Sequence, residues 1–185
     1  MLRNRIDTGL SERRGDWFFV VCFSLFAVSS LASDLPYALG GLDGGGPLAA
    51  GNRWYAAIAG DELFAAAPAF LRVRTGMSAL LFGPFYVLLV WAVVRGAEWI
   101  RWPAIFGCGG IAVGCLEHLA WEFSIGPAPR HPAVFLAFNL PYAIVPALFA
   151  WRMRHAAPFA DRFPTSSITA ALRSRGEDDP LRLGR

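Results

Sequence analysis

The hydrophobic positions of this chain fall into four long runs, and the charged residues collect at the two ends and in the connecting segments. A charge-free run of about 18 or more residues is long enough to cross the hydrocarbon of a membrane as an α-helix. The runs predict transmembrane helices over about residues 17–34, 75–94, 102–122 and 133–151. We therefore expect an all-α polytopic membrane protein whose domain, residues 17–153, is a four-transmembrane-helix bundle.

The remaining segments are more polar. Residues 1–16 predict a cytoplasmic N-terminal segment, and residues 154–185 a flexible cytoplasmic tail. Residues 35–74 combine glycine-rich turns with aromatic and acidic side chains, which suits a segment at the membrane surface. The first run also resembles a signal peptide with a cleavage site near residues 30–32, but its aromatic character and the three further runs favour a retained anchor.

Composition supports the membrane assignment and suggests an orientation. Hydrophobic residues make up 55% of the chain and charged residues only 17%, and all 17 basic residues are arginine. The arginine-only usage points to a GC-rich genome and hence to a bacterial plasma membrane. Arginines precede the first run, lie in the hairpin at residues 95–101 and follow the fourth run. With four spans these three segments share one side of the membrane, and an excess of arginine predicts that this side, with both termini, is cytoplasmic. Arg53, Arg72 and Arg74 fall in the long first loop, where charge has less weight.

The sequence gives no reason to expect a cofactor, a metal or nucleic acid. The net charge of +3 is too small and too scattered for a nucleic-acid surface. Cys22, Cys108 and Cys115 all lie within apolar runs and lack the spacing of a metal site, so we expect them to pack in the protein interior. No phosphate-binding loop or catalytic-triad order is present.

Ionisable residues within or beside the runs are the candidates for chemistry, because such groups are costly in a membrane. They are Asp34, Glu117, His118 and Glu122. At 1.5 Å per residue, Asp34 and Glu117 come to a similar depth, and His118 and Glu122 share one helical face. In one interpretation these groups meet in an apolar bundle interior. In the other, Glu122 lies in water at the outer interface and Asp34 merely ends the first span.

The fourth run contains two further polar groups. Asn139 and Tyr142 lie about one turn apart, either facing the bundle interior or joining helices through hydrogen bonds.

Three sequence motifs occur in the order and spacing of a known family. They are the stretches Trp54–Asp61, Arg95–Ile105 and Pro141–Pro146. On these motifs the chain resembles the EXPERA domain family, which includes the sigma-2 receptor and the emopamil-binding sterol isomerase. The resemblance implies a four-helix bundle of EXPERA type with a site, open to lipid, for sterol-like ligands or amphiphilic amines, and it suggests a homodimer.

The resemblance also assigns roles to particular residues. It makes Asp34 the first-helix aspartate that pairs with cationic ligands, Asp61 a second aspartate of more structural character, and Tyr142 an aromatic lining residue. It makes Asn139 and Glu122 polar residues of the ligand site. One position departs from the family, because Ser78 falls where both branches carry a glutamate.

Two functions follow as hypotheses. The first is binding of a sterol-like, isoprenoid or other terpenoid lipid, with Asp34, Asp61, Glu117, Asn139 and Tyr142 as ligand-binding residues. The second is a sterol or terpenoid isomerase or cyclase that uses Glu122 and His118 as catalytic acid and base. Ser78 favours binding, because carbocation chemistry would miss one stabilising carboxylate. A purely structural membrane subunit is a third possibility.

Overall fold

The computed structural model describes residue 10, residues 13–156 and residues 158–159. Within them four helices are long and apolar enough to cross a membrane, which confirms the expected all-α architecture. The first long helix is built from α1 (Asp16–Ser29), η1 (Ser30–Asp34) and α2 (Leu35–Gly40), and the second from α5 (Ala69–Met77), η2 (Ser78–Phe82) and α6 (Gly83–Arg95). The third consists of η3 (Glu98–Ile100) and α7 (Arg101–Ser124), and the fourth of α8 (Pro132–Asn139) and α9 (Pro141–Met153).

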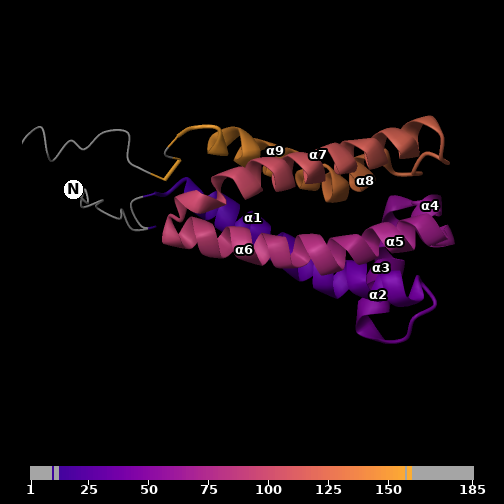
Figure 1. Cartoon of the computed structure of the whole chain (residues 1–185). Helices are drawn as coiled ribbons and strands as arrows, with labels where there is room; N and C mark the ends of the chain where they lie inside the picture. The colour runs from indigo at the N-terminus through magenta and orange to yellow at the C-terminus, as the bar shows by residue number, and fades with distance from the viewer. Residues whose placement is uncertain (1–9, 11–12, 157, 160–185) are drawn as a thin grey trace, which may run out of the picture.

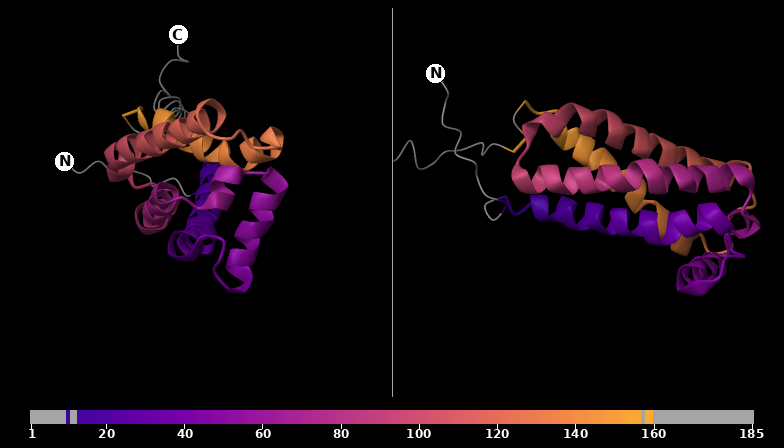
Figure 2. Two further views of the ribbon diagram at one scale, coloured as in Figure 1. Left: turned by 90° about the vertical axis from the view of Figure 1, so that its right-hand side faces the viewer. Right: turned by 60° about the horizontal axis from the view of Figure 1, so that its bottom comes forward.

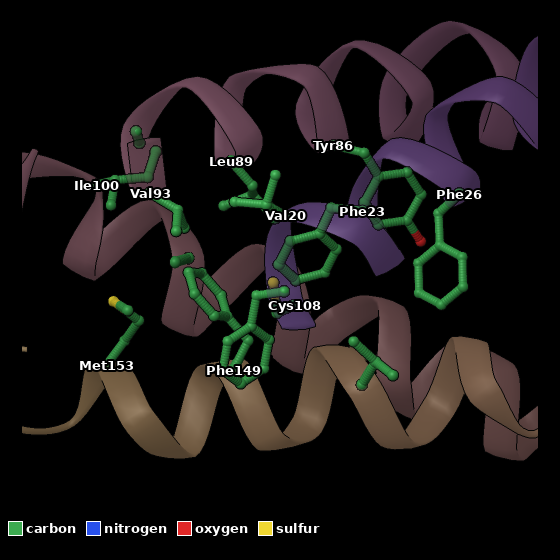
Figure 3. Packing of buried hydrophobic residues seen from close by; sticks show 14 of the residues in the cluster. Val20, Phe23, Phe26, Tyr86, Leu89, Val93, Ile100, Cys108, Phe149 and Met153 are labelled. Atoms are coloured by element: carbon green, nitrogen blue, oxygen red, sulfur yellow. The ribbon is translucent and has the colours of Figure 1, made fainter. Parts of the chain in front are cut away.

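The long helices pack in two principal pairs. Helix α1 lies along α6, and α7 lies along α9 (Figure 1). The main core fills the space between the pairs with aromatic rings, and Figure 3 shows Phe23 between Tyr86 and Phe149. Phe23 stacks on Tyr86 at 5.8 Å and meets Phe149 edge-on at 5.0 Å between ring centroids. In a bilayer such close packing, rather than escape from water, holds the helices together.

The first two long helices each contain one π-helical turn, and proline gives the physical reason. Pro36 and Pro84 follow the π turns and have no backbone N–H, and in a regular α-helix their rings would collide with the carbonyl four residues earlier. The helix widens instead, so that the amide of Leu35 reaches the Ser30 carbonyl. The second π turn, η2, has the same pattern, and η1 and η2 lie against each other.

Two shorter helices, α3 (Gly46–Ala59) and α4 (Glu62–Ala66), connect the first long helix to the second. They lie at the end of the bundle opposite the start of α1 (Figure 2). Helix α3 is joined to the first π turn through buried Asn52, which donates to the Ser33 carbonyl at 2.9 Å and accepts from the Ser33 hydroxyl at 2.7 Å. The connecting segment is therefore fastened to the bundle, next to the π turns.

A second contact fixes the end of α3 to the loop before α8. The amides of Arg130 and His131 donate to the carbonyls of Gly60 and Ala59 at 3.1 and 3.0 Å. Gly60 has a φ of 60°, a left-handed conformation that glycine adopts without strain. This backbone pairing brings α3 beside α8.

The long helices extend beyond the charge-free runs of the sequence. The first continues through Asp34 to Gly40, and the second already begins at Ala69 and so includes Arg72 and Arg74. Arg72 donates to the carbonyls of Ala38 and Leu39. This charged side chain therefore supplies hydrogen-bond donors to carbonyls that have no partner within the helix at the end of the first long helix. Most of the expected N-terminal segment and of the tail at residues 154–185 lies outside the described residues.

The end of the bundle at which α1 begins is here called the basic end. It carries the arginines Arg13, Arg14, Arg95, Arg101, Arg152 and Arg154. Asp16 is buried among them and pairs with Arg13 at 2.7 Å and with Arg152. Arg13 also donates to the Val93 carbonyl at the end of α6. This ion cluster joins α1 to both α6 and α9.

Replacing Asp16 with asparagine is expected to lower the free energy of unfolding by about 3 kcal/mol, because the change leaves buried Arg13 without its counter-charge. Circular dichroism of the detergent-solubilised protein during thermal or denaturant unfolding measures the change. Asp43→Asn is the matched control, because Asp43 is exposed in the loop after α2. Equal losses of stability in the two variants would contradict the role of the ion cluster.

Candidate functional site

The paired π turns place a set of hydroxyl groups around Asp34, here called the serine cluster (Ser29, Ser30, Asp34, Ser78 and Tyr142). Asp34 is half-buried at the end of η1, and the Ser78 hydroxyl at the start of η2 hydrogen-bonds to its side chain. Ser30 lies 3.4 Å from Ser78 between the hydroxyl oxygens. Asp34 therefore does not end the first span but faces the second helix.

Tyr142 closes the serine cluster from α9. Its hydroxyl lies 2.6 Å from that of Ser29, and its ring stacks on Phe26 at 4.2 Å. Because the Ser29 hydroxyl donates to the Phe26 carbonyl, Tyr142 is the donor to Ser29. Tyr142 thus joins the fourth helix to the first, and its hydroxyl lies in the electrostatic field of Asp34.

Glu122 is the centre of a second set, here called the glutamate cluster (Tyr55, Asp61, His118, Glu122 and Asn139). Its side chain is 0% exposed, so the sequence interpretation that places Glu122 in water does not fit. Both of its carboxyl oxygens lack a hydrogen-bond partner among the described residues. The nearest basic atom given by the structure is Nε2 of His118, 3.8 Å from Oε1, on the helical face that the two residues share.

A chain of hydrogen bonds joins Asn139, Tyr55 and Asp61 of the glutamate cluster. Asn139 on α8 donates to the Tyr55 hydroxyl at 2.8 Å, and Tyr55 on α3 donates to Asp61 at 3.3 Å. The other oxygen of Asp61 accepts from the Phe64 amide at 2.8 Å and so caps α4. Asn139 and Asp61 are therefore brought into one network, joined by Tyr55, which belongs to the Trp54–Asp61 motif but was not among the predicted site residues.

Burial changes the acidity of the two groups in this network that lie outside the long helices. Desolvation raises the pKa of Asp61 above its ordinary value of 3.8, against the opposing hydrogen bonds from Phe64 and Tyr55. Burial likewise raises the pKa of Tyr55, so this phenol stays protonated and remains a donor.

Arg74 lies between the two clusters. It extends from α5 and donates through Nη2 to the carbonyl of Gly114 on α7. Its charge acts on Cys115, His118 and Glu122, and Asp34 acts on Cys115 as well. From the sequence we expected Arg74 in the first loop. The signal that was available is its spacing of four residues before Ser78, which puts both on one helical face.

The structure separates the remaining candidates. Glu117 is exposed on the outer surface of α7 and belongs to neither cluster. Asp34 and Glu122 make no contact with each other and lie in different clusters. The buried thiol of Cys108 packs in the main core, as its apolar surroundings suggested. Among the described residues no group of histidine, cysteine and carboxylate side chains is arranged to hold a metal ion.

The glutamate cluster can offer a ligand both a carboxyl group and an imidazole. An unpartnered buried carboxyl costs about 1–3 kcal/mol, and more when it is charged. A hydroxyl, carbonyl or amine that reaches Glu122 would remove that cost. His118, with a side chain that is 16% exposed, separates the carboxyl from the bundle surface.

Asp61→Ala is expected to lower the free energy of unfolding by about 2 kcal/mol, because the change removes the cap of α4 and the acceptor of Tyr55. Asp61→Asn keeps the cap. Because the folded pKa of Asp61 lies above 3.8, the wild type should lose stability relative to Asp61→Asn as pH rises from 3.8 through the folded pKa. Unfolding curves of the three proteins across pH measure both effects. A difference between wild type and Asp61→Asn that does not change with pH would contradict the burial of this carboxyl.

Comparison with known proteins identifies the family of this chain. No curated protein and no solved structure gives a match to the chain. A family model does match, over residues 47–153, which is more than half of the chain and includes the glutamate cluster, Arg74 and Tyr142. The protein is an integral membrane protein that belongs to the EXPERA (EXPanded EBP superfamily) family.

Proposed function

We propose that this protein binds a sterol-like or isoprenoid lipid inside the membrane, with the polar group of the lipid against Glu122. The observation that carries the proposal is the fully buried Glu122 carboxyl, which has no hydrogen-bond partner among the described residues. In lipid no water is present to hydrogen-bond to such a carboxyl group. A ligand that supplies a hydrogen-bond partner is therefore favoured. Membership of the EXPERA family supports a sterol-related ligand.

The serine cluster provides a second polar anchor for the same ligand. Asp34, Ser30 and Ser78 lie on the first two helices, whereas Glu122 lies on the third, so a long rigid molecule with polar groups at two positions suits the bundle. An amphiphilic amine is a further ligand class that a carboxylate such as Asp34 would accept.

We also propose the orientation in which the basic end is cytoplasmic, in a bacterial plasma membrane. Arginines at the starts of α1 and α7 and at the ends of α6 and α9 all belong to this end. An excess of arginine on the cytoplasmic side is the usual determinant of orientation. Both termini of the bundle then face the cytoplasm.

The binding proposal predicts a co-purifying lipid. Native mass spectrometry of the purified protein, followed by lipid extraction, should detect a terpenoid in the wild type. The fraction of protein carrying it should fall about tenfold or more in Glu122→Gln and in Asp34→Asn, because a charge-assisted hydrogen bond is lost. Glu117→Gln is the matched control, since Glu117 is an exposed glutamate on the same helix. Equal occupancy in Glu117→Gln and Glu122→Gln would refute the assignment of Glu122.

One observation favours an isomerase or cyclase as a second candidate function. His118 and Glu122 place an imidazole 3.8 Å from a carboxyl group, an arrangement that can deliver a proton to one alkene carbon and remove another elsewhere. Such a step neither gains nor loses atoms, because the proton added to one carbon is balanced by the proton removed from another.

The enzyme hypothesis predicts exchange with solvent. Incubation in D₂O with a sterol that carries a ring double bond, or with squalene, should give an isomerised or cyclised product containing deuterium, detected by mass spectrometry. Glu122→Gln should lower the rate about 100-fold or more, whereas Glu117→Gln should leave it unchanged. Binding of the probe without deuterium in any product would leave lipid binding as the function.

A further inference from the structure

Arg74 is a charged side chain within the second long helix, and nothing in the proposed function uses it. It is half-buried and donates one hydrogen bond, to the Gly114 carbonyl. Among the described residues no carboxylate pairs with it, although Arg74 is near enough for its charge to act on Glu122. A guanidinium carries five N–H donors, so most of its hydrogen-bonding capacity is directed to no group of the described chain.

The side chain of Arg74 reaches toward the middle of the membrane. Measured along the helices at 1.5 Å per residue, Arg74 lies about 31 Å from Arg95, whereas Gly114 lies only about 20 Å from Arg101. Both reference arginines belong to the basic end. An arginine that only avoids lipid extends its side chain outward to the nearer membrane surface. Arg74 extends the other way, to the Gly114 carbonyl on α7.

The charges around Arg74 determine what it can accept. Arg74 faces His118 and Cys115, and Ser78 lies on its own helical face one turn further along. An amine ligand held at this position would be repelled by the guanidinium, whereas a carboxylate or phosphate would pair with it in the planar geometry that arginine favours. The hydroxyl of Ser78 is a neutral donor to the same anion.

We propose that Arg74 binds the acidic headgroup, a carboxylate or a phosphate, of the lipid held in this bundle. The proposal rests on the proposed lipid-binding function and narrows the ligand to an acidic amphiphile. Glu122 then contacts a second polar position of the ligand. The positive charge of Arg74 offsets the repulsion that the carboxylates of Glu122 and Asp34 would exert on an acidic headgroup. The same arginine selects against cationic amphiphiles.

The test uses four probes with one geranylgeranyl chain and different headgroups: a carboxylic acid, a phosphate, an alcohol and an ammonium. Their affinities are measured for the full chain in nanodiscs of neutral phosphatidylcholine. For each probe the affinity of a variant is divided by that of the wild type, so that differences in membrane partitioning between headgroups cancel. The variants are Arg74→Gln, Arg74→Lys and, as the matched control, Arg14→Gln, because Arg14 is exposed at the basic end.

In Arg74→Gln the affinity for the acid and the phosphate should fall about tenfold or more, and that for the alcohol should change by less than about twofold. Arg74→Lys should keep part of the acid affinity, and Arg14→Gln all of it. Retained alcohol binding shows that each variant is folded. Equal effects of Arg74→Gln on acid and alcohol would overturn the proposal, as would displacement of the acid probe by inorganic phosphate alone, which would indicate a site for a soluble anion. Failure of all four probes to bind the wild type would instead refute lipid binding itself.

Discussion

The arrangement of this bundle depends on how a membrane helix accommodates proline. In lipid every backbone N–H and C=O group must find a partner within the protein. Pro36 and Pro84 each remove one donor, and the first two long helices respond with π turns at equivalent places. Because the turns lie side by side, two irregular stretches of backbone are buried against each other rather than against lipid.

The π turns also explain why polar side chains gather where they do. An extra residue in a turn rotates everything that follows around the helix axis, so Asp34 is directed toward the second helix. Gly83 permits this close approach, because a Cβ at that position would lie 3.3 Å from Cβ of Ser30. The same irregularity exposes Ser33 to Asn52, which attaches α3 to the bundle. Helix α3 in turn carries Tyr55 to the glutamate cluster.

The sequence was sufficient for features that follow from the bilayer itself. Four helices, their order and the family could be predicted, because spans need length and low charge and because three motifs keep their spacing. Asp34 was harder to place, since a carboxylate close to a proline resembles the end of a span. Arg72 and Arg74 resembled loop residues because a hydropathy pattern counts their charges. The pattern does not show that their guanidinium groups donate hydrogen bonds to backbone carbonyls of neighbouring helices.

The hydropathy pattern could not predict which way the side chains of the site are directed. Helical rise gives the depth of Glu122 but not its burial, which depends on α3 and α8 lying beside it. Those helices are joined by backbone contacts between Gly60 and Arg130, distant in sequence and without a motif of their own. Glu117 illustrates the point, because it is ionisable and close to Glu122 in the chain, yet it faces outward.

The two ends of the bundle use arginine in opposite ways, and the contrast explains why Arg74 is informative. At the basic end Arg13 and Arg152 share the single counter-charge of Asp16, and these ion pairs join helices. Near the clusters the balance is reversed: within the described part of the chain Glu122 lacks a hydrogen-bond partner, and Arg74 donates only to a carbonyl. A bundle that was merely a scaffold would gain stability by letting these two groups form an ion pair. Their separation, with His118 beside Glu122 and Gly114 holding Arg74, keeps both available to a third molecule.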